Sequence, residues 1–305
     1  MSAFFALLPF ESVEERTINP ATKRGIIGIV ISLVLGSLIA LAGNSGSVIA
    51  WGTGVFGLCI LLAFAIQWIV FIPSFLAQTE HYFDLTGSLT YLSVVGFALA
   101  FSPAADLRAM IIAALIAIWA TRLGTFLFRR IRKDGSDSRF DEIKPVFARF
   151  LMAWSLQGVW VSVTAAAGLA AITSQSRAEL GLIGWAGIAV WLIGFGIEVI
   201  ADRQKRQHRA AHPGEFIRSG LWAWSRHPNY FGEIVLWIGI AIIAFPTLSG
   251  WQYATLISPV FVYLLLTRAS GVPLLEAKSD AKWGDDPEYQ AYKDKTPVLM
   301  MRKPG

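Results

Sequence analysis

The stretch LGLIGWAGIAVWLIGFGIEVIADRQKRQHR, residues 180–209, decides the fold class. Residues 180–201 are almost all apolar, and charged residues crowd the end of the stretch. A bilayer core about 30 Å thick needs about 20 apolar residues per helix. The stretch therefore predicts a helix that crosses a membrane and leaves it near Asp202.

Similar apolar runs recur along the whole chain. The 305 residues are 55% hydrophobic and 15% charged, against about 25% charged in soluble domains, and the mean hydropathy is +0.55. Because some runs are short or closely linked, we expect seven or eight spans. The predicted fold is an all-α integral membrane protein, a single polytopic domain over residues 1–305 with cytoplasmic loops and no Rossmann domain. The expected spans are 24–43, 49–77, 86–103, 107–128, 147–173, 180–201, 230–246 and 250–267.

Lysine and arginine predict the orientation, because basic loops stay cytoplasmic. They concentrate in residues 16–24, 129–144, 203–226 and 268–303, whereas the other loops carry only Arg108 and Arg177. Both termini are expected in the cytoplasm, at the inner membrane of a bacterium or the endoplasmic reticulum of a eukaryote. The concentration of Lys and Arg in cytoplasmic loops also explains the pI of about 9.4, so we expect no nucleic-acid partner.

Two further features narrow the class of protein. Residues 1–17 have no basic leader and no small-residue cleavage site, which argues against a secretory signal peptide. Cys59 is the single cysteine, so neither a disulfide framework nor a thiolate metal cluster is expected. Gly52, Gly54 and Gly57 satisfy G-x-G-x-x-G, but they begin a membrane span instead of linking a strand to a helix. We interpret them as small residues that let helices approach closely.

Charged residues inside or beside the spans point to function, because burying them in a bilayer is expensive. Arg122 lies about two turns inside an apolar run and requires an anion or a carboxylate partner. A second group shares one helix face by spacings of three, four and seven. Its members are Glu198, Asp202, Lys205, Arg206 and Arg209. These residues could also be a solvated helix end, although Glu198 lies nearly one turn inside the apolar segment.

The segment SRHPNYFGE, residues 225–233, runs from a loop into the next apolar helix. Pro228 suits the first turn of that helix, and Asn229 and Glu233 share a face at i and i+4. Cations, amides and aromatic residues at one membrane face predict a pocket for a phosphate-bearing cofactor. The residues that we expect there are Arg226, His227, Tyr230, Arg268, Glu276, Tyr289 and Tyr292.

The pattern S-G-L-W-x-W-S-R-H-P-N-Y-F-G-E, residues 219–233, together with the upstream Asp-x-x-x-Arg-x-x-Arg at 202–209, resembles the bacterial branch of the steroid 5-alpha-reductase family. Membrane sterol reductases and isoprenylcysteine carboxyl methyltransferases carry related elements. The resemblance is strong over roughly the last two-thirds of the chain and weak before it. It implies a polytopic enzyme that uses NADPH to reduce the C4=C5 double bond of 3-oxo-4-ene steroids or a related enone lipid.

The resemblance also implies a division of roles along the chain. Residues 1–130 would form the pocket for a lipid-like substrate that enters from the bilayer, and residues 147–305 would hold the cofactor. Arg122 would face the nicotinamide end. Glu198 and Glu276 stand where the mammalian enzymes have asparagine and tyrosine. The other residues implied at the cofactor site are Asp202, Arg206, Arg209, Asn229, Glu233 and Arg268.

Hydride addition to an enone builds negative charge on the ketone oxygen, so a donor aimed at that oxygen lowers the barrier. In the family, a glutamate and a tyrosine share this role, and their positions fall here near Asp84 and at Trp119. We expect Asp84 to polarise the ketone, although an aspartate before an apolar run could also be the helix N-cap. Its neighbours Glu80, His81 and Tyr82 could substitute for it. Gln67 and Tyr91 are expected to make packing and helix contacts.

Two other classes of function are compatible with parts of this pattern. An S-adenosylmethionine-dependent methyltransferase of the isoprenylcysteine carboxyl methyltransferase type would share the RHPxY element, but five arginines suit a phosphate-rich dinucleotide better than a sulfonium donor. A transporter would be expected to show paired repeats, and no internal repeat is evident. Membrane lipids are the expected surroundings, and no obligate protein partner is indicated.

Overall fold

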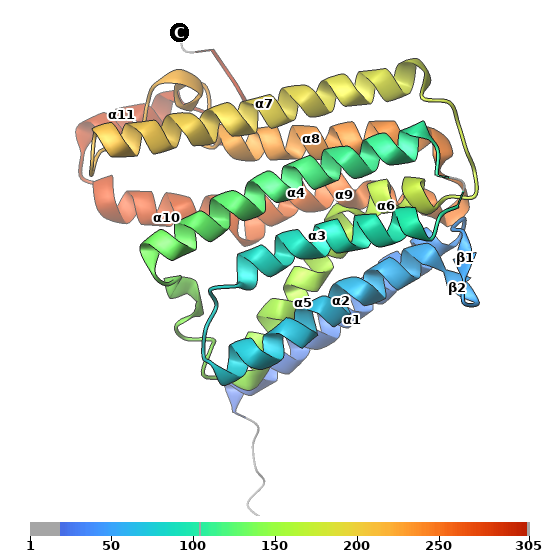
Figure 1. Ribbon diagram of the computed structural model, residues 1–305. Helices are drawn as coiled ribbons and strands as arrows, with labels where there is room; N and C mark the ends of the chain where they lie inside the picture. Colours follow the sequence, from blue (N-terminus) through green and yellow to red (C-terminus); the bar gives the residue numbers. More distant parts are fainter. Residues whose placement is uncertain (1–18, 104, 304–305) are drawn as a thin grey trace, which may run out of the picture.

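Long helices run from end to end in the computed structural model, which describes residues 19–103 and 105–303 (Figure 1). The α-helices are α1 (Pro20–Asn44), α2 (Val55–Leu76), α3 (Phe83–Ala100), α4 (Leu107–Asp134), α5 (Phe147–Thr164), α6 (Ala166–Thr173), α7 (Gly181–Ala211), α8 (Pro228–Ala244), α9 (Ser258–Leu264), α10 (Gly271–Trp283) and α11 (Pro287–Lys295). Shorter 3-10 turns are η1 (Ser138–Phe140), η2 (Gly220–Ala223), η3 (Phe245–Thr247) and η4 (Gly250–Ile257), and η5 (Leu265–Ala269) is a π-helical turn. Strands β1 (Ile49–Ala50) and β2 (Thr53–Gly54) form an antiparallel hairpin.

The predicted fold class is confirmed. Within the described part of the chain, 7 helices are long and apolar enough to cross a membrane, or up to 8 if α5 and α6, which meet at a 57° bend, form one span. Large apolar side chains cover the outside of the bundle, for example Leu41 at 71% exposure and Leu182 at 87%. Such a surface suits lipid tails instead of water. The chain is a multi-pass membrane protein.

Besides the bent span 147–173, two predicted spans have different local structure from the expected single helix. The span 49–77 was expected to be helical from residue 49, which is wrong, because residues 49–54 form the hairpin. Trp51 and Gly52 have positive φ values of 49° and 79°, which a helix does not allow. The span 250–267 is not one α-helix either, since it comprises η4, α9 and η5.

The glycines of the G-x-G-x-x-G pattern serve the hairpin and its contact with α1. Gly52 takes the positive φ of the turn. The amide of Gly57 donates to Asn44 Oδ1 at 2.7 Å, and a Cβ atom on Gly54 would lie 2.2 Å from the same oxygen. The expected close approach is therefore present at Gly54 and Gly57, at the end of α1.

Helices α7 and α8 lie side by side with their backbones in contact (Figure 1). Gly194 of α7 and Gly232 of α8 form the closest point. A Cβ atom on Gly194 would be 2.4 Å from the amide nitrogen of Leu236, and one on Gly232 would be 2.7 Å from the amide nitrogen of Glu198. Because no side chain fits between the helices here, residues next to these glycines are forced close together.

The loops that carry the candidate site gather at one end of the bundle. The start of α1, the ends of α2, α4 and α7, and helices α10 and α11 all lie at the left of Figure 1. At the opposite end, the buried side chain of Arg108 donates to the carbonyl oxygens of Ala178, Leu180 and Ile243. The expected absence of a signal peptide concerns residues outside the described part of the chain.

Candidate functional site

Arg122 is the centre of the most deeply placed charged cluster. Its guanidinium comes from α4 and pairs with Glu198 Oε1 through Nη1 and with Asp202 Oδ2 through Nη2. Glu198 and Asp202 are one turn apart on α7, so both face α4. The expected partner of Arg122 is thus a pair of carboxylates. The guanidinium carbon also lies 5.8 Å from the ring centroid of Phe195.

Glu233 adds a third carboxylate to this cluster. It follows Gly232 in α8, at the point where α7 and α8 touch, and it is only 7% exposed. Its carboxylate makes no hydrogen bond or ion pair with the residues that the structure describes. The guanidinium of Arg122 pairs with Glu198 and Asp202 and not with Glu233. Because an unpaired buried carboxylate costs several kcal/mol, Glu233 requires a held proton or a ligand.

Other polar atoms on α4, α7 and α8 are buried and make no hydrogen bond of ordinary geometry with the described residues. They are Glu198 Oε2, Trp119 Nε1, which is directed at the Glu198 carboxylate, and Asn229 Oδ1. Native structures leave few such atoms unsatisfied, and each one requires an explanation such as a ligand or water. These atoms are two acceptors and one donor, which a bound polar group could satisfy.

The remaining predicted arginines of this region are exposed. Arg206 and Arg209 lie on the last turns of α7, and Arg268 lies in η5. Arg206 stacks its guanidinium carbon 5.7 Å from the ring centroid of Phe126. None of the three forms an ion pair with the described residues, so their charges are available to an anionic group. The structure does not bring Arg268 into contact with the Arg122 cluster.

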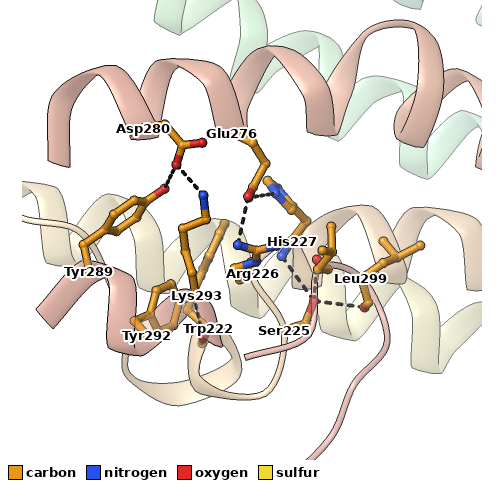
Figure 2. Close-up of polar contacts among 11 residues, drawn as sticks. Trp222, Ser225, Arg226, His227, Glu276, Asp280, Tyr289, Tyr292, Lys293 and Leu299 are labelled. Carbon is orange, nitrogen blue, oxygen red and sulfur yellow. Dashed lines mark hydrogen bonds and ion pairs between the residues drawn. The ribbon is translucent and has the colours of Figure 1, made fainter. Parts of the chain in front are cut away.

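Arg226, His227 and Glu276 pair with one another instead of lining an open pocket (Figure 2). Glu276 of α10 accepts from Arg226 Nη1 at 3.0 Å and interacts with His227 Nε2 at 2.7 Å. His227 precedes Pro228, which takes the first position of α8 as expected, and its ring stacks on Tyr230 with centroids 5.6 Å apart. These four residues lock the start of α8 to α10.

Helix α11 adds further contacts to α10 and to the segment before α8 (Figure 2). We call these contacts, together with the pairs made by Glu276, the clasp. Asp280 accepts from Tyr289 at 2.9 Å and from Lys293 at 2.6 Å, while Tyr292 donates to the carbonyl of Trp222 at 2.8 Å. Burial, assisted by the hydrogen bond to Asp280, raises the pKa of Tyr289 to about 12. Tyr289 and Tyr292 both donate hydrogen bonds within the protein. Their expected contact with a cofactor stays a prediction.

Asp84 lies at a small cavity between α3, α4 and α5, separate from the clasp. The cavity has a volume of about 20 Å³ and is lined by Asp84, Gly87, Ser88, Tyr91, Leu123, Leu127, Gln157, Trp160 and Val161. Helix α3 begins at Phe83 and its N-cap is Tyr82. The alternative that Asp84 caps the helix is therefore wrong, although its charge in the first turn is favourable. Asp84 instead pairs with Arg130 at 3.4 Å.

The three neighbours of Asp84 do not line this cavity. Glu80 accepts from Lys144 at 2.6 Å and from the amide of Asp137 at 2.8 Å, which braces the loop before α5. Burial raises the pKa of Glu80, but these hydrogen bonds outweigh it and leave the pKa below its ordinary value. His81 Nε2 lies 2.5 Å from the carbonyl oxygen of Gly135, and Tyr82 is 53% exposed. A catalytic role is less well supported for them than for Asp84.

Tyr91 packs as expected, with its ring centroid 5.1 Å from that of Trp119, and it also lines the cavity. It is 4% exposed, and its hydroxyl is directed at Thr164 without ordinary hydrogen-bond geometry. Gln157 Oε1 at the same cavity is likewise buried without a partner. Asp84, Ser88 and Tyr91 follow one another at spacings of four and three, so the helical period could have found this polar stripe. Gln67 makes the expected helix contact, donating to Thr90 at 2.9 Å.

Known proteins resemble this chain over different shares of its length. An uncharacterized protein of Schizosaccharomyces pombe is 21% identical over 316 residues, covering 93% of this chain and 81% of the relative. The 3-oxo-5-alpha-steroid 4-dehydrogenase 1 of Bos taurus is 39% identical over 88 residues, and that of Rattus norvegicus is 36% identical over 88 residues. Each of these two alignments covers 27% of this chain and 31% of the relative.

No solved structure matches the chain. The steroid dehydrogenase alignments are local, whereas one family model matches residues 70–296, from within α2 to just after α11. That range contains the Arg122 cluster, the Asp84 cavity and the clasp. The chain therefore belongs to the family described as protein of unknown function DUF1295.

Proposed function

We propose that the protein is a membrane reductase that uses NADPH to reduce the C4=C5 double bond of a 3-oxo-4-ene steroid or a related enone lipid. The observation that carries the proposal is the 39% identity over 88 residues to a bovine enzyme named 3-oxo-5-alpha-steroid 4-dehydrogenase 1. The buried Arg122 cluster supports the proposal, because a site with unsatisfied acceptors deep in a bundle is typical of ligand binding.

The residues present fit the cofactor in two respects. The buried acceptors Glu198 Oε2 and Asn229 Oδ1 suit the N–H donors of a carboxamide. Arg206, Arg209 and Arg268 are exposed and free of carboxylate partners in the described structure, so they can bind phosphate oxygens. When bound, NADPH supplies the hydride. Arg122 then has a supporting role, since it holds Glu198 and Asp202 in position.

The substrate ketone would be polarised at the Asp84 cavity. A hydrogen-bond donor placed there stabilises the negative charge that develops on the ketone oxygen during hydride addition. Tyr91 can donate in its ordinary neutral state, whereas Asp84 must hold a proton to donate. A cavity of about 20 Å³ holds about one water molecule. A substrate entering from the bilayer therefore requires the helices that line the cavity to move apart.

Ligand-dependent stability in detergent tests the cofactor class. We expect NADPH to raise the thermal stability of the purified protein, by about 2.7 kcal/mol at a concentration of 100 times Kd. NADH should stabilise less at equal concentration, because it lacks the 2′-phosphate that the free arginines would bind. Stabilisation by S-adenosylmethionine alone would overturn the reductase proposal in favour of a methyltransferase.

Turnover of a 3-oxo-4-ene steroid tests the chemical step. Asp84→Ala and Tyr91→Phe are expected to lower kcat by about 10²-fold or more, the loss typical of a removed oxyanion donor, with little change in NADPH binding. Tyr82→Phe is the matched control, because Tyr82 is exposed and lies outside the cavity. Normal turnover in both cavity variants would remove this cavity from the mechanism.

A further inference from the structure

Gln157 is a buried amide at the Asp84 cavity, and it lies on a different helix from Asp84 and Tyr91. It belongs to α5, lines the cavity and is only 4% exposed. Its Oε1 atom is buried and accepts no hydrogen bond from the described residues. Because leaving a buried acceptor unsatisfied costs free energy, a hydrogen-bond donor is expected beside Gln157 in the cavity.

Two glycines bring polar side chains to the walls of this cavity. Gly87 of α3 faces Gln157, and a Cβ atom on Gly87 would lie 2.7 Å from Gln157 Nε2. Gly124 of α4 faces Ser88, and a Cβ atom there would lie 2.5 Å from Ser88 Oγ. The missing side chains therefore leave the space that Gln157 and Ser88 occupy.

The cavity has room for one small polar group. Its volume of about 20 Å³ exceeds the roughly 10–15 Å³ that one water molecule needs. Its polar lining comes from Asp84, Ser88, Tyr91 and Gln157. A serine hydroxyl can donate or accept a hydrogen bond, whereas the amide oxygen of glutamine can only accept. An occupant that carries an O–H group, as water does, therefore matches this lining better than a bare carbonyl oxygen.

We propose that Gln157 is a further substrate-binding residue and that its Oε1 atom accepts a hydrogen bond from an O–H group in the cavity. In the free protein that group is a water molecule. During the reduction it is the hydroxyl of the enol that forms when the ketone oxygen takes up a proton. The proposal rests on the proposed function, because it presupposes that the ketone binds at this cavity.

The enol forms and decays by balanced transfers. The β-carbon of the enone receives the hydride with its two electrons, the C=C electron pair shifts between the α-carbon and the carbonyl carbon, and the carbonyl π pair moves to the oxygen. Asp84 gives its proton to that oxygen and becomes a carboxylate, which Arg130 faces at 3.4 Å. The enol then returns this proton to Asp84 while the α-carbon takes a proton from the solvent. The net uptake is one hydride and one proton.

Gln157 distinguishes the enol from the ketone. A ketone oxygen can only accept hydrogen bonds, so a bound ketone leaves Gln157 Oε1 without a donor, whereas the enol O–H group can donate to it. An interaction that forms only as the reaction proceeds raises kcat without tightening substrate binding. Gln157→Leu should therefore lower kcat for a 3-oxo-4-ene steroid without raising KM.

Equilibrium binding of two steroids to the purified full-length protein in detergent tests the proposal without any turnover. The two probes share one saturated skeleton without the C4=C5 bond and differ only in a 3-oxo or a 3-hydroxy group. We expect the wild-type protein to bind the 3-hydroxy probe more tightly, because its O–H group satisfies Gln157 Oε1. In Gln157→Leu, the ratio of the two affinities should shift about tenfold toward the 3-oxo probe, equivalent to 1.4 kcal/mol.

Gln67→Leu is the matched control for this measurement. Gln67 is a fully buried glutamine of α2 that donates to Thr90 and does not line the cavity. It undergoes the same chemical change as Gln157, so a general effect of losing a buried amide would appear in both variants. The ratio of affinities in Gln67→Leu should stay within about twofold of the wild-type ratio, since the oxygen of the probe lies in the cavity.

Each outcome has a distinct meaning. An unchanged ratio in Gln157→Leu, or equal or tighter binding of the 3-oxo probe by the wild-type protein, would overturn the role of Gln157 while leaving the reductase proposal intact. Binding of neither probe to the wild-type protein would instead overturn the proposed function. If Gln157→Leu does not fold, the wild-type ratio and the same measurement on Gln157→Met still decide the question.

Discussion

Replacing Arg122 by glutamine is expected to destabilise the protein by about 3 kcal/mol. The change leaves Glu198 and Asp202 without their cation, and their side chains are 4% and 10% exposed. Removing one partner of a buried ion pair costs about 3–5 kcal/mol. The lower end applies here, because the Arg122 side chain is 20% exposed and water can partly replace it.

A neutral triple variant separates the charge effect from a packing effect. Arg122→Gln combined with Glu198→Gln and Asp202→Asn removes all three charges at nearly constant volume. It should recover most of the lost stability, because replacing both partners of a buried pair is often close to neutral. Arg130→Gln is the surface control. The Arg130 side chain is 42% exposed and pairs with Asp84 at 3.4 Å, so its loss should cost at most about 1 kcal/mol.

The assay is denaturation in detergent followed by tryptophan fluorescence, with all variants at the same pH and salt concentration. Arg122→Gln should unfold at clearly lower denaturant concentration than the wild-type protein, and the triple variant should lie between them. The reasoning would be refuted if Arg122→Gln were as stable as Arg130→Gln. It would also be refuted if the triple variant were less stable than the single variant, because packing would then dominate over charge.

Three further results are expected. Gly232→Leu should disrupt the contact between α7 and α8, where even a Cβ atom would lie 2.6 Å from a backbone oxygen, and should lower both stability and expression, whereas Gly52→Leu on the exposed hairpin should affect only the turn. For Glu80, the folded-state pKa lies below its ordinary value, about 4.3 in the unfolded chain. Its stabilising contribution is therefore present above that pH and lost as pH falls through the folded pKa. The stability difference between the wild-type protein and Glu80→Gln should accordingly shrink below about pH 4, and a constant difference would contradict this assignment. Finally, Ser136→Cys and Trp51→Cys should react with a membrane-impermeant thiol reagent from opposite sides of the membrane, with Ser136→Cys on the cytoplasmic side, against a low background because Cys59 is fully buried.

The roles of single polar residues were predictable only in part from the sequence. Arg122 was expected to need an anionic partner because of its depth in an apolar run, and it has two. Arg226, His227 and Glu276 were grouped correctly at one end of the bundle, but their mutual pairing was not foreseen. Tyr91 was expected to pack and does so against Trp119, but its place at the Asp84 cavity was not foreseen, because composition does not show which helices enclose a residue.

Hydropathy along the chain was sufficient to establish a polytopic helical membrane protein. In a bilayer, each helix satisfies its own backbone hydrogen bonds, so the existence and approximate position of a span depend on local composition. Hydropathy did not predict the hairpin before α2 or the 3-10 and π segments within residues 250–269. These segments are as apolar as an α-helix, so composition does not distinguish them.

The pairing of Arg122 with two carboxylates of another helix, in contrast, depends on contacts between helices. Spacing on α7 places Glu198 and Asp202 on one face, but it does not state which helix that face meets. Gly194 and Gly232 decide the distance between α7 and α8, and the rotation of α4 directs Arg122 toward them. The two pairs of Arg122 join residues more than 70 positions apart, and they arise only when the helices pack together.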